Sequence, residues 1–85
     1  MRIEVLGSGC SNCARLAELA QEAARDMGVE ATVEKVTDIR QIMSYRVLGT
    51  PGLVIDGNVV SAGRMPGKAE IATWIADAMA AAHEA

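Results

Sequence analysis

The chain is 85 residues long, 51% of them hydrophobic and 22% charged, with a formal net charge of −3. This length and composition predict one globular domain, residues 1–85, with a small core, and they exclude a disordered chain. The net charge is negative, and the sequence has no cluster of basic residues like that of a nucleic-acid-binding protein. No apolar stretch approaches the ~20 residues of a membrane span. We therefore expect neither nucleic acid nor a membrane as a partner.

The first half of the chain predicts a strand followed by a long helix. Residues 2–6 read as a β-strand that ends at the small residues Gly7-Ser8-Gly9. Because this strand begins at the first residues, it leaves no room for a signal peptide, and we expect a cytoplasmic protein. From Cys13 to Met27 apolar residues recur at helical spacing, and Gly28 follows where a helix takes a left-handed cap.

A second strand and a short helix are expected next. Apolar and polar residues alternate from Val29 to Val33, which predicts a half-buried strand. Thr37 is expected to cap the short helix. Its apolar face would consist of Ile39, Ile42 and Met43.

The last third of the chain predicts a hairpin and a final helix. Residues 53–55 and 59–60 flank Asp56-Gly57-Asn58, which is a tight-turn signal. Apolar residues at helical spacing then run from Ile71 to Ala82, with fraying expected from Ala81. The order β-α-β-α-β-β-α, with a parallel first pair and an antiparallel hairpin, predicts an α/β sandwich around a four-stranded mixed sheet.

The two cysteines, in Cys10-Ser11-Asn12-Cys13, carry the chemistry. Cys10 precedes the long helix, where free N–H groups and the helix dipole stabilise a thiolate. Cys13 lies one turn along on the inward stripe, so it should be more buried and could resolve a mixed disulfide formed at Cys10. The pair could also hold zinc or copper, although two thiolates supply only half of a tetrahedral zinc shell. A third reading is two buried cysteines without chemistry.

Three stretches together resemble a known family: residues 3–13 with the cysteine pair, Thr50-Pro51-Gly52 leading into the hairpin, and Gly63-Arg64-Met65-Pro66 before the last helix. They resemble the thioredoxin fold, and within it the small thioredoxin-like redox-active disulfide proteins. The resemblance implies a three-layer sandwich and a protein disulfide oxidoreductase.

By that resemblance Cys10 is the nucleophile and Cys13 the resolving thiol. Pro51 is similar to the cis-proline that faces the disulfide in this fold, and Thr50 would offer backbone groups to an extended substrate. The implied partners are a disulfide-containing protein and a reductant similar to thioredoxin reductase. No cofactor or metal is expected beyond the reversible Cys10–Cys13 disulfide.

Glu4 has two readings. Thioredoxins keep a buried acid six positions before their first cysteine, and Glu4 stands at that offset from Cys10, so it could accept the proton of Cys13. Alternatively, Glu4 shares an exposed sheet face with Arg2, two residues away. Tyr45 and Arg46 border the rim of the site or form a solvated helix end.

Two rival functions remain open from the sequence. One is a metal chaperone, because copper-carrier domains also place a cysteine pair after their first strand, although their element order is β-α-β-β-α-β. The other is a module that senses redox state without turnover.

Overall fold

The computed structural model describes residues 1–7 and 11–84. Along this part of the chain the elements are β1 (Arg2–Leu6), α1 (Ser11–Asp26), β2 (Thr32–Val36), α2 (Ile39–Ser44), β3 (Gly52–Ile55), β4 (Asn58–Ala62) and α3 (Lys68–Glu84). This is the predicted order β-α-β-α-β-β-α.

The strands form one mixed sheet in the order β2-β1-β3-β4. β1 and β2 are parallel, and the intervening α1 supplies the crossover that parallel strands require. β3 pairs antiparallel with β1 on one side and with β4 on the other. Asp56 and Gly57 have φ angles of 47° and 84°, the left-handed geometry of a tight hairpin turn. The predicted four-stranded mixed sheet is confirmed.

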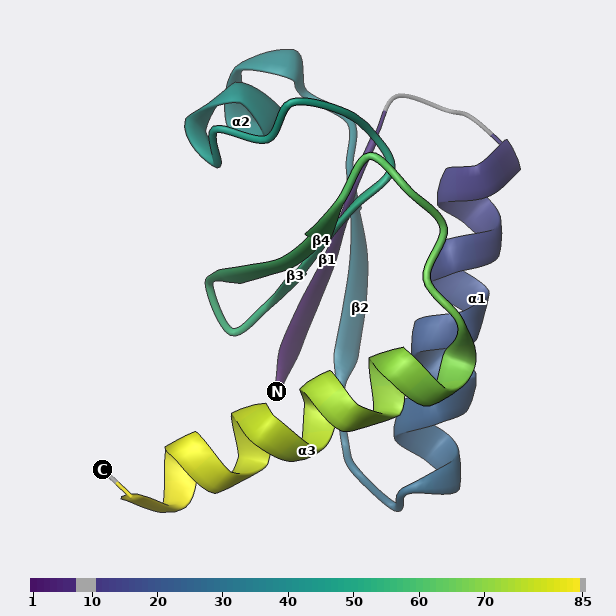
Figure 1. Ribbon diagram of the computed structural model, residues 1–85, viewed down its shortest axis with the longest axis vertical. Coiled ribbons are helices and arrows are strands. Elements are labelled where there is room, and N and C mark those ends of the chain that lie inside the picture. Colours follow the sequence, from purple (N-terminus) through teal and green to yellow (C-terminus); the bar gives the residue numbers. More distant parts are fainter. Residues whose placement is uncertain (8–10, 85) are drawn as a thin grey trace.

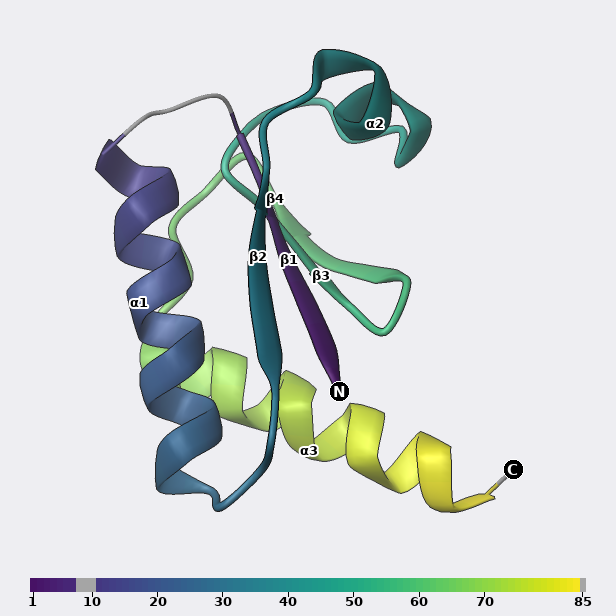
Figure 2. The same ribbon diagram turned by 180° about the vertical axis from the view of Figure 1, so that it is seen from behind.

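The molecule has three layers because side chains along β1 alternate between the two faces of the sheet. Ile3 and Val5 are fully buried in a core with α1 and α3, whereas Leu6 belongs to a second core that includes Ile42 of α2. In both Figure 1 and Figure 2, α1 runs along the sheet, α3 crosses near its lower end, and α2 lies on the side away from α1. The expected three-layer sandwich is confirmed.

The second strand begins later than predicted. β2 starts at Thr32, not at Val29, because the chain is still closing α1. The Gly28 N–H donates to the Arg25 carbonyl and the Val29 N–H to the Ala24 carbonyl, with Gly28 at a φ of 69°. These two bonds and the left-handed Gly28 form a Schellman motif. Gly28 and Val29 therefore belong to the end of α1 and not to the following strand.

The short helix α2 differs from the prediction in its cap and its buried face. Asp38, not Thr37, is the N-cap, and its carboxylate accepts a hydrogen bond of 2.8 Å from the Arg40 N–H. Only Ile42 is buried, while Ile39 and Met43 are 67% and 68% exposed. With six residues, the helix is too short to bury a whole stripe against the sheet.

Helix α3 packs on α1 and the sheet through the fully buried Ile71 and Ile75. The Lys68 ammonium pairs with the Asp26 carboxylate, which ties the start of α3 to the end of α1. α3 extends to Glu84, and fraying from Ala81 stays a prediction. In the described part of the chain, no helix has the length and apolar character to cross a bilayer.

Candidate functional site

The candidate site lies at one end of the sheet, where the end of β1, the first turn of α1 and the segment between α2 and β3 meet (Figure 1). Cys13 stands in that first turn and is 3% exposed, in the core that holds Val5, Leu16 and Leu53. Its expected burial is therefore confirmed. Its sulfur takes part in a disulfide. Cys10, the predicted nucleophile, lies outside the described residues.

Gly7 allows the end of β1 to approach Cys13 closely. A Cβ atom placed on Gly7 would overlap the Cys13 sulfur, and it would lie 3.5 Å from Cys13 Cβ and 3.7 Å from Thr50 Cβ. The Gly7 N–H is held by the Val36 carbonyl of β2 at 3.0 Å. One backbone position therefore borders both a predicted site cysteine and Thr50. In the sequence Gly7 is only the first of three small residues, and residue spacing does not predict this close approach.

Thr50 and Pro51 reach this point from the other side of the sheet. Their peptide bond is cis. Pro51 is buried, Thr50 is exposed, and Gly52 begins β3 next to Leu6. The structure thus brings two of the predicted site residues, Thr50 and Cys13, to the same place around Gly7.

The loop after β4 completes this end of the molecule. The Gly63 N–H donates a hydrogen bond of 3.1 Å to the Pro51 carbonyl. A Cβ atom on Gly49 would lie 3.2 Å from Gly63 Cα, so the two backbones are in close contact. The sequence does not predict these contacts, because they join residues that meet only through the β3–β4 pairing.

Glu70 holds this loop against the start of α3. Its carboxylate accepts hydrogen bonds from Arg64 at 3.2 and 2.7 Å and from the Gly67 N–H at 3.2 Å. The Arg64 bond, followed by that of Gly67, lowers the pKa of the Glu70 carboxyl below its ordinary value. The Arg64 guanidinium also lies 5.9 Å from the centre of the Trp74 ring, which is within cation–π range.

A groove of about 600 Å³ begins beside Thr50. It runs between the segment before Thr50 and strand β4, and its lining consists of Tyr45, Arg46, Val47, Leu48, Gly49, Val59, Ala62 and Gly63. Leu48 is fully exposed and Val59 is 41% exposed. Such apolar side chains in an open groove can contact an apolar segment of another molecule.

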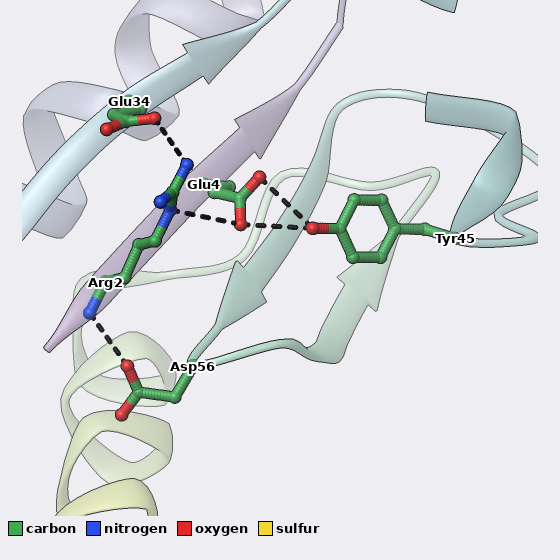
Figure 3. Close-up of polar contacts among 5 residues, drawn as sticks. All are labelled: Arg2, Glu4, Glu34, Tyr45 and Asp56. Atoms are coloured by element: carbon green, nitrogen blue, oxygen red, sulfur yellow. Dashed lines mark hydrogen bonds and ion pairs between the residues drawn. The ribbon is translucent and has the colours of Figure 1, made fainter. Parts of the chain in front are cut away.

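Glu4 lies on the face of the sheet opposite Cys13. Its neighbours Ile3 and Val5 share a core with Cys13, so the alternation along β1 turns Glu4 the other way. There it accepts hydrogen bonds from the Tyr45 hydroxyl and pairs with Arg2, whose Nε is 3.5 Å from Glu4 Oε1 (Figure 3). This geometry favours the alternative in which Glu4 shares a face with Arg2. The side chain is only 13% exposed, however, because Tyr45 and Arg2 cover it.

Tyr45 is therefore bonded to the sheet and is not simply a solvated helix end. Burial, followed by the hydrogen bond and the charge of Glu4, raises the pKa of the Tyr45 hydroxyl. The phenol thus stays protonated and acts as a hydrogen-bond donor throughout the neutral pH range. Across residues 1–7 and 11–84, no three His, Cys, Asp or Glu side chains are grouped so as to hold a metal ion.

Comparisons with known proteins agree with this geometry. A protein-family model described as a thioredoxin domain matches residues 1–76. A protein named thioredoxin from Methanothermobacter thermautotrophicus is 38% identical over 71 residues, which cover 84% of this chain and 92% of that protein. A protein named thioredoxin from Methanocaldococcus jannaschii is 35% identical over 69 residues, which cover 81% of this chain and 79% of that protein.

Proposed function

Because the chain belongs to the thioredoxin family and is a disulfide oxidoreductase, we propose that Cys10 and Cys13 are its redox centre and that Thr50 and Pro51 position the substrate beside them. The observation that carries the proposal is the meeting of Cys13 and Thr50 around Gly7. A backbone position without a side chain lets Cys13 of α1 and Thr50 of the segment before β3 approach the same point.

The reaction needs two exchanges. The Cys10 thiolate attacks one sulfur of a disulfide in the partner protein, forming a mixed disulfide and releasing the other sulfur as a thiolate that takes up a proton. Cys13, as its thiolate, then attacks the Cys10 sulfur, and the second sulfur of the partner leaves and is protonated. Two electrons pass from the dithiol to the partner, and the Cys10–Cys13 disulfide remains.

The proton of Cys13 goes to solvent or to the departing thiolate in this proposal. Glu4 is left out of the transfer because its carboxylate lies on the opposite face and accepts from Tyr45. Its role as proton acceptor therefore stays a prediction, without support from its position.

The groove beside Thr50 supports a protein as the substrate. Its apolar side chains Leu48 and Val59 suit a segment that flanks a cysteine of the partner. A thioredoxin-reductase-like protein would return two electrons to the disulfide, and in this proposal the chain itself uses only its cysteine pair, without a bound cofactor.

The roles of the two cysteines are tested by trapping. Iodoacetamide added to the reduced protein near neutral pH should label Cys10 before Cys13, because Cys13 is buried. Cys13→Ser should accumulate mixed disulfides with partner proteins, whereas Cys10→Ser should accumulate few, because the attacking sulfur is gone. Preferential labelling of Cys13, or trapping by Cys10→Ser alone, would reverse the roles.

Turnover and metal content separate the proposal from its rivals. Catalytic amounts of the protein should accelerate the reduction of insulin disulfides by dithiothreitol, which a redox sensor without turnover would not do. Zinc or copper that stays bound in a one-to-one ratio after dialysis of the reduced monomer would instead support the metal chaperone.

A further inference from the structure

Tyr45 and Glu4 form a hydrogen-bonded link between two distant parts of the chain. The Tyr45 hydroxyl lies 3.0 and 3.1 Å from the two carboxylate oxygens of Glu4, so its single proton is shared between them. Figure 3 shows the phenol ring reaching from the end of α2 to β1, with Arg2 on the other side of the Glu4 carboxylate. A hydrogen bond to a partly buried carboxylate is among the stronger ones in proteins.

Tyr45 stands where helix α2 ends. Its N–H donates to the Ile42 carbonyl at 3.2 Å, and the next N–H, of Arg46, donates to the Met43 carbonyl at 2.9 Å. Arg46 has a φ of 57°, which turns the chain out of the helix. The Tyr45 ring also packs against the core formed by Leu6, Val36, Ile42 and Val54. The segment that follows, residues 46–51, therefore begins at a residue held by both packing and a charged hydrogen bond.

The same segment ends at the candidate site. Residues 46–51 belong to no helix or strand, and Leu48 within them is fully exposed. At the far end the Pro51 carbonyl is bonded to the Gly63 N–H, and Thr50 borders Gly7 and Cys13. Between these ends Val47 packs against the same core and Gly49 contacts Gly63, so the Tyr45 anchor acts together with these contacts in placing Thr50.

We propose that Tyr45 is a positioning residue for the disulfide exchange: its hydrogen bond to Glu4 holds residues 46–51 so that Thr50 meets the substrate beside Cys13. This inference rests on the proposed function. Tyr45 packs against the second core, on the other side of the sheet from the core that holds Cys13, so its loss should weaken the binding of the partner protein and leave the chemical step unchanged. The bond also assigns Glu4 a use on the face of the sheet opposite Cys13.

The test compares variants at both ends of the bond in the reduction of a protein disulfide. Tyr45→Phe and Glu4→Leu should each raise KM about fivefold, the scale of one net hydrogen bond, without changing kcat. The double variant should raise KM no further than either single one, because the same bond is lost. Glu4→Gln keeps an oxygen that can accept from Tyr45, so its KM should stay within about twofold of the wild type.

Ile71→Val is the matched control. It removes one methyl group from a fully buried side chain of α3 and so destabilises the fold without touching the Tyr45 segment. Its KM should equal that of the wild type. A KM that rises equally in Ile71→Val would show that the effect reflects stability alone, and would overturn the proposal.

A measurement independent of activity tests the placement of Thr50 directly. In the wild type and in Ile71→Val, a nuclear Overhauser effect should join the Thr50 methyl group to the Gly7 α protons, and in Tyr45→Phe it should weaken. If this Overhauser effect has the same intensity in Tyr45→Phe as in the wild type, the proposal is overturned, whatever the value of KM. A kcat that falls in Tyr45→Phe while KM stays constant would also overturn it. A wild type that reduces no disulfide would refute the proposed function, and the Overhauser effect alone would then decide whether Tyr45 places the segment.

Discussion

Replacing Gly7 by alanine should shift the redox equilibrium of the cysteine pair. The new methyl group would overlap the sulfur of the disulfide-bonded Cys13, while its separations from Cys13 Cβ and Thr50 Cβ, 3.5 and 3.7 Å, are ordinary contacts. The sulfur must therefore move by more than about 1 Å to reach a normal separation of about 3.5–4.0 Å. Overpacking of this kind costs about 1–3 kcal/mol.

The cost should fall mainly on the oxidised protein. A reduced Cys13 can turn about χ1 to another staggered position, whereas a disulfide holds its sulfur in place. If the whole overpacking cost of about 1–3 kcal/mol falls on the oxidised protein, the redox potential changes by about 20–65 mV for a two-electron couple. Destabilising the disulfide favours reduction, so the potential of Gly7→Ala should become less negative by that amount.

The assay equilibrates each protein with dithiothreitol or glutathione buffers and counts alkylated cysteines by mass spectrometry. Gly67→Ala is the control, because the nearest atom to its new methyl group, Glu70 Oε1, is 4.0 Å away. Its potential should equal that of the wild type. A Gly7→Ala potential that changes by less than about 10 mV, or becomes more negative, would refute the reasoning.

Two further predictions concern stability. Among the described residues the buried Ser61 hydroxyl has no hydrogen-bond partner. Ser61→Ala should therefore raise the free energy of unfolding, measured by urea titration, by about 1 kcal/mol. A decrease of similar size in the free energy of unfolding would contradict this. Glu70 has a lowered pKa in the folded state, so the stability that it contributes is present above its unfolded value of 4.5 and is lost as the pH falls through the folded value. Thermal unfolding between about pH 6 and 3 should therefore depend less on pH in Glu70→Gln, and an unchanged dependence would show that the Arg64 pair contributes nothing.

The element order follows from the residue pattern alone. Helical spacing from Cys13 to Met27 and the Asp56-Gly57 turn depend on contacts between near neighbours along the chain, so the pattern alone predicts them. For the same reason Cys13 was correctly expected on the inward stripe of its helix. The resemblance, carried by the cysteine pair and Thr50-Pro51, indicated a thioredoxin-like protein, and the family comparison confirms it.

The local errors came from competing hydrogen bonds. Val29 continues an alternating pattern, yet its N–H closes α1, and this bond moved the start of β2 to Thr32. Asp38 displaced Thr37 as the cap because its carboxylate reaches the Arg40 N–H. Such choices depend on which of two adjacent residues finds a partner, and spacing does not distinguish them.

The assembly of the candidate site depends on long-range contacts that the sequence pattern does not show. Gly7, Cys13 and Thr50 come from three separate segments, and their contact results from strand pairing and helix packing over long stretches of chain. The Tyr45–Glu4 bond joins residues 41 positions apart on one face of the sheet. No periodic signal encodes such a contact, because periodicity reports which face a residue occupies and not which distant residue meets it there.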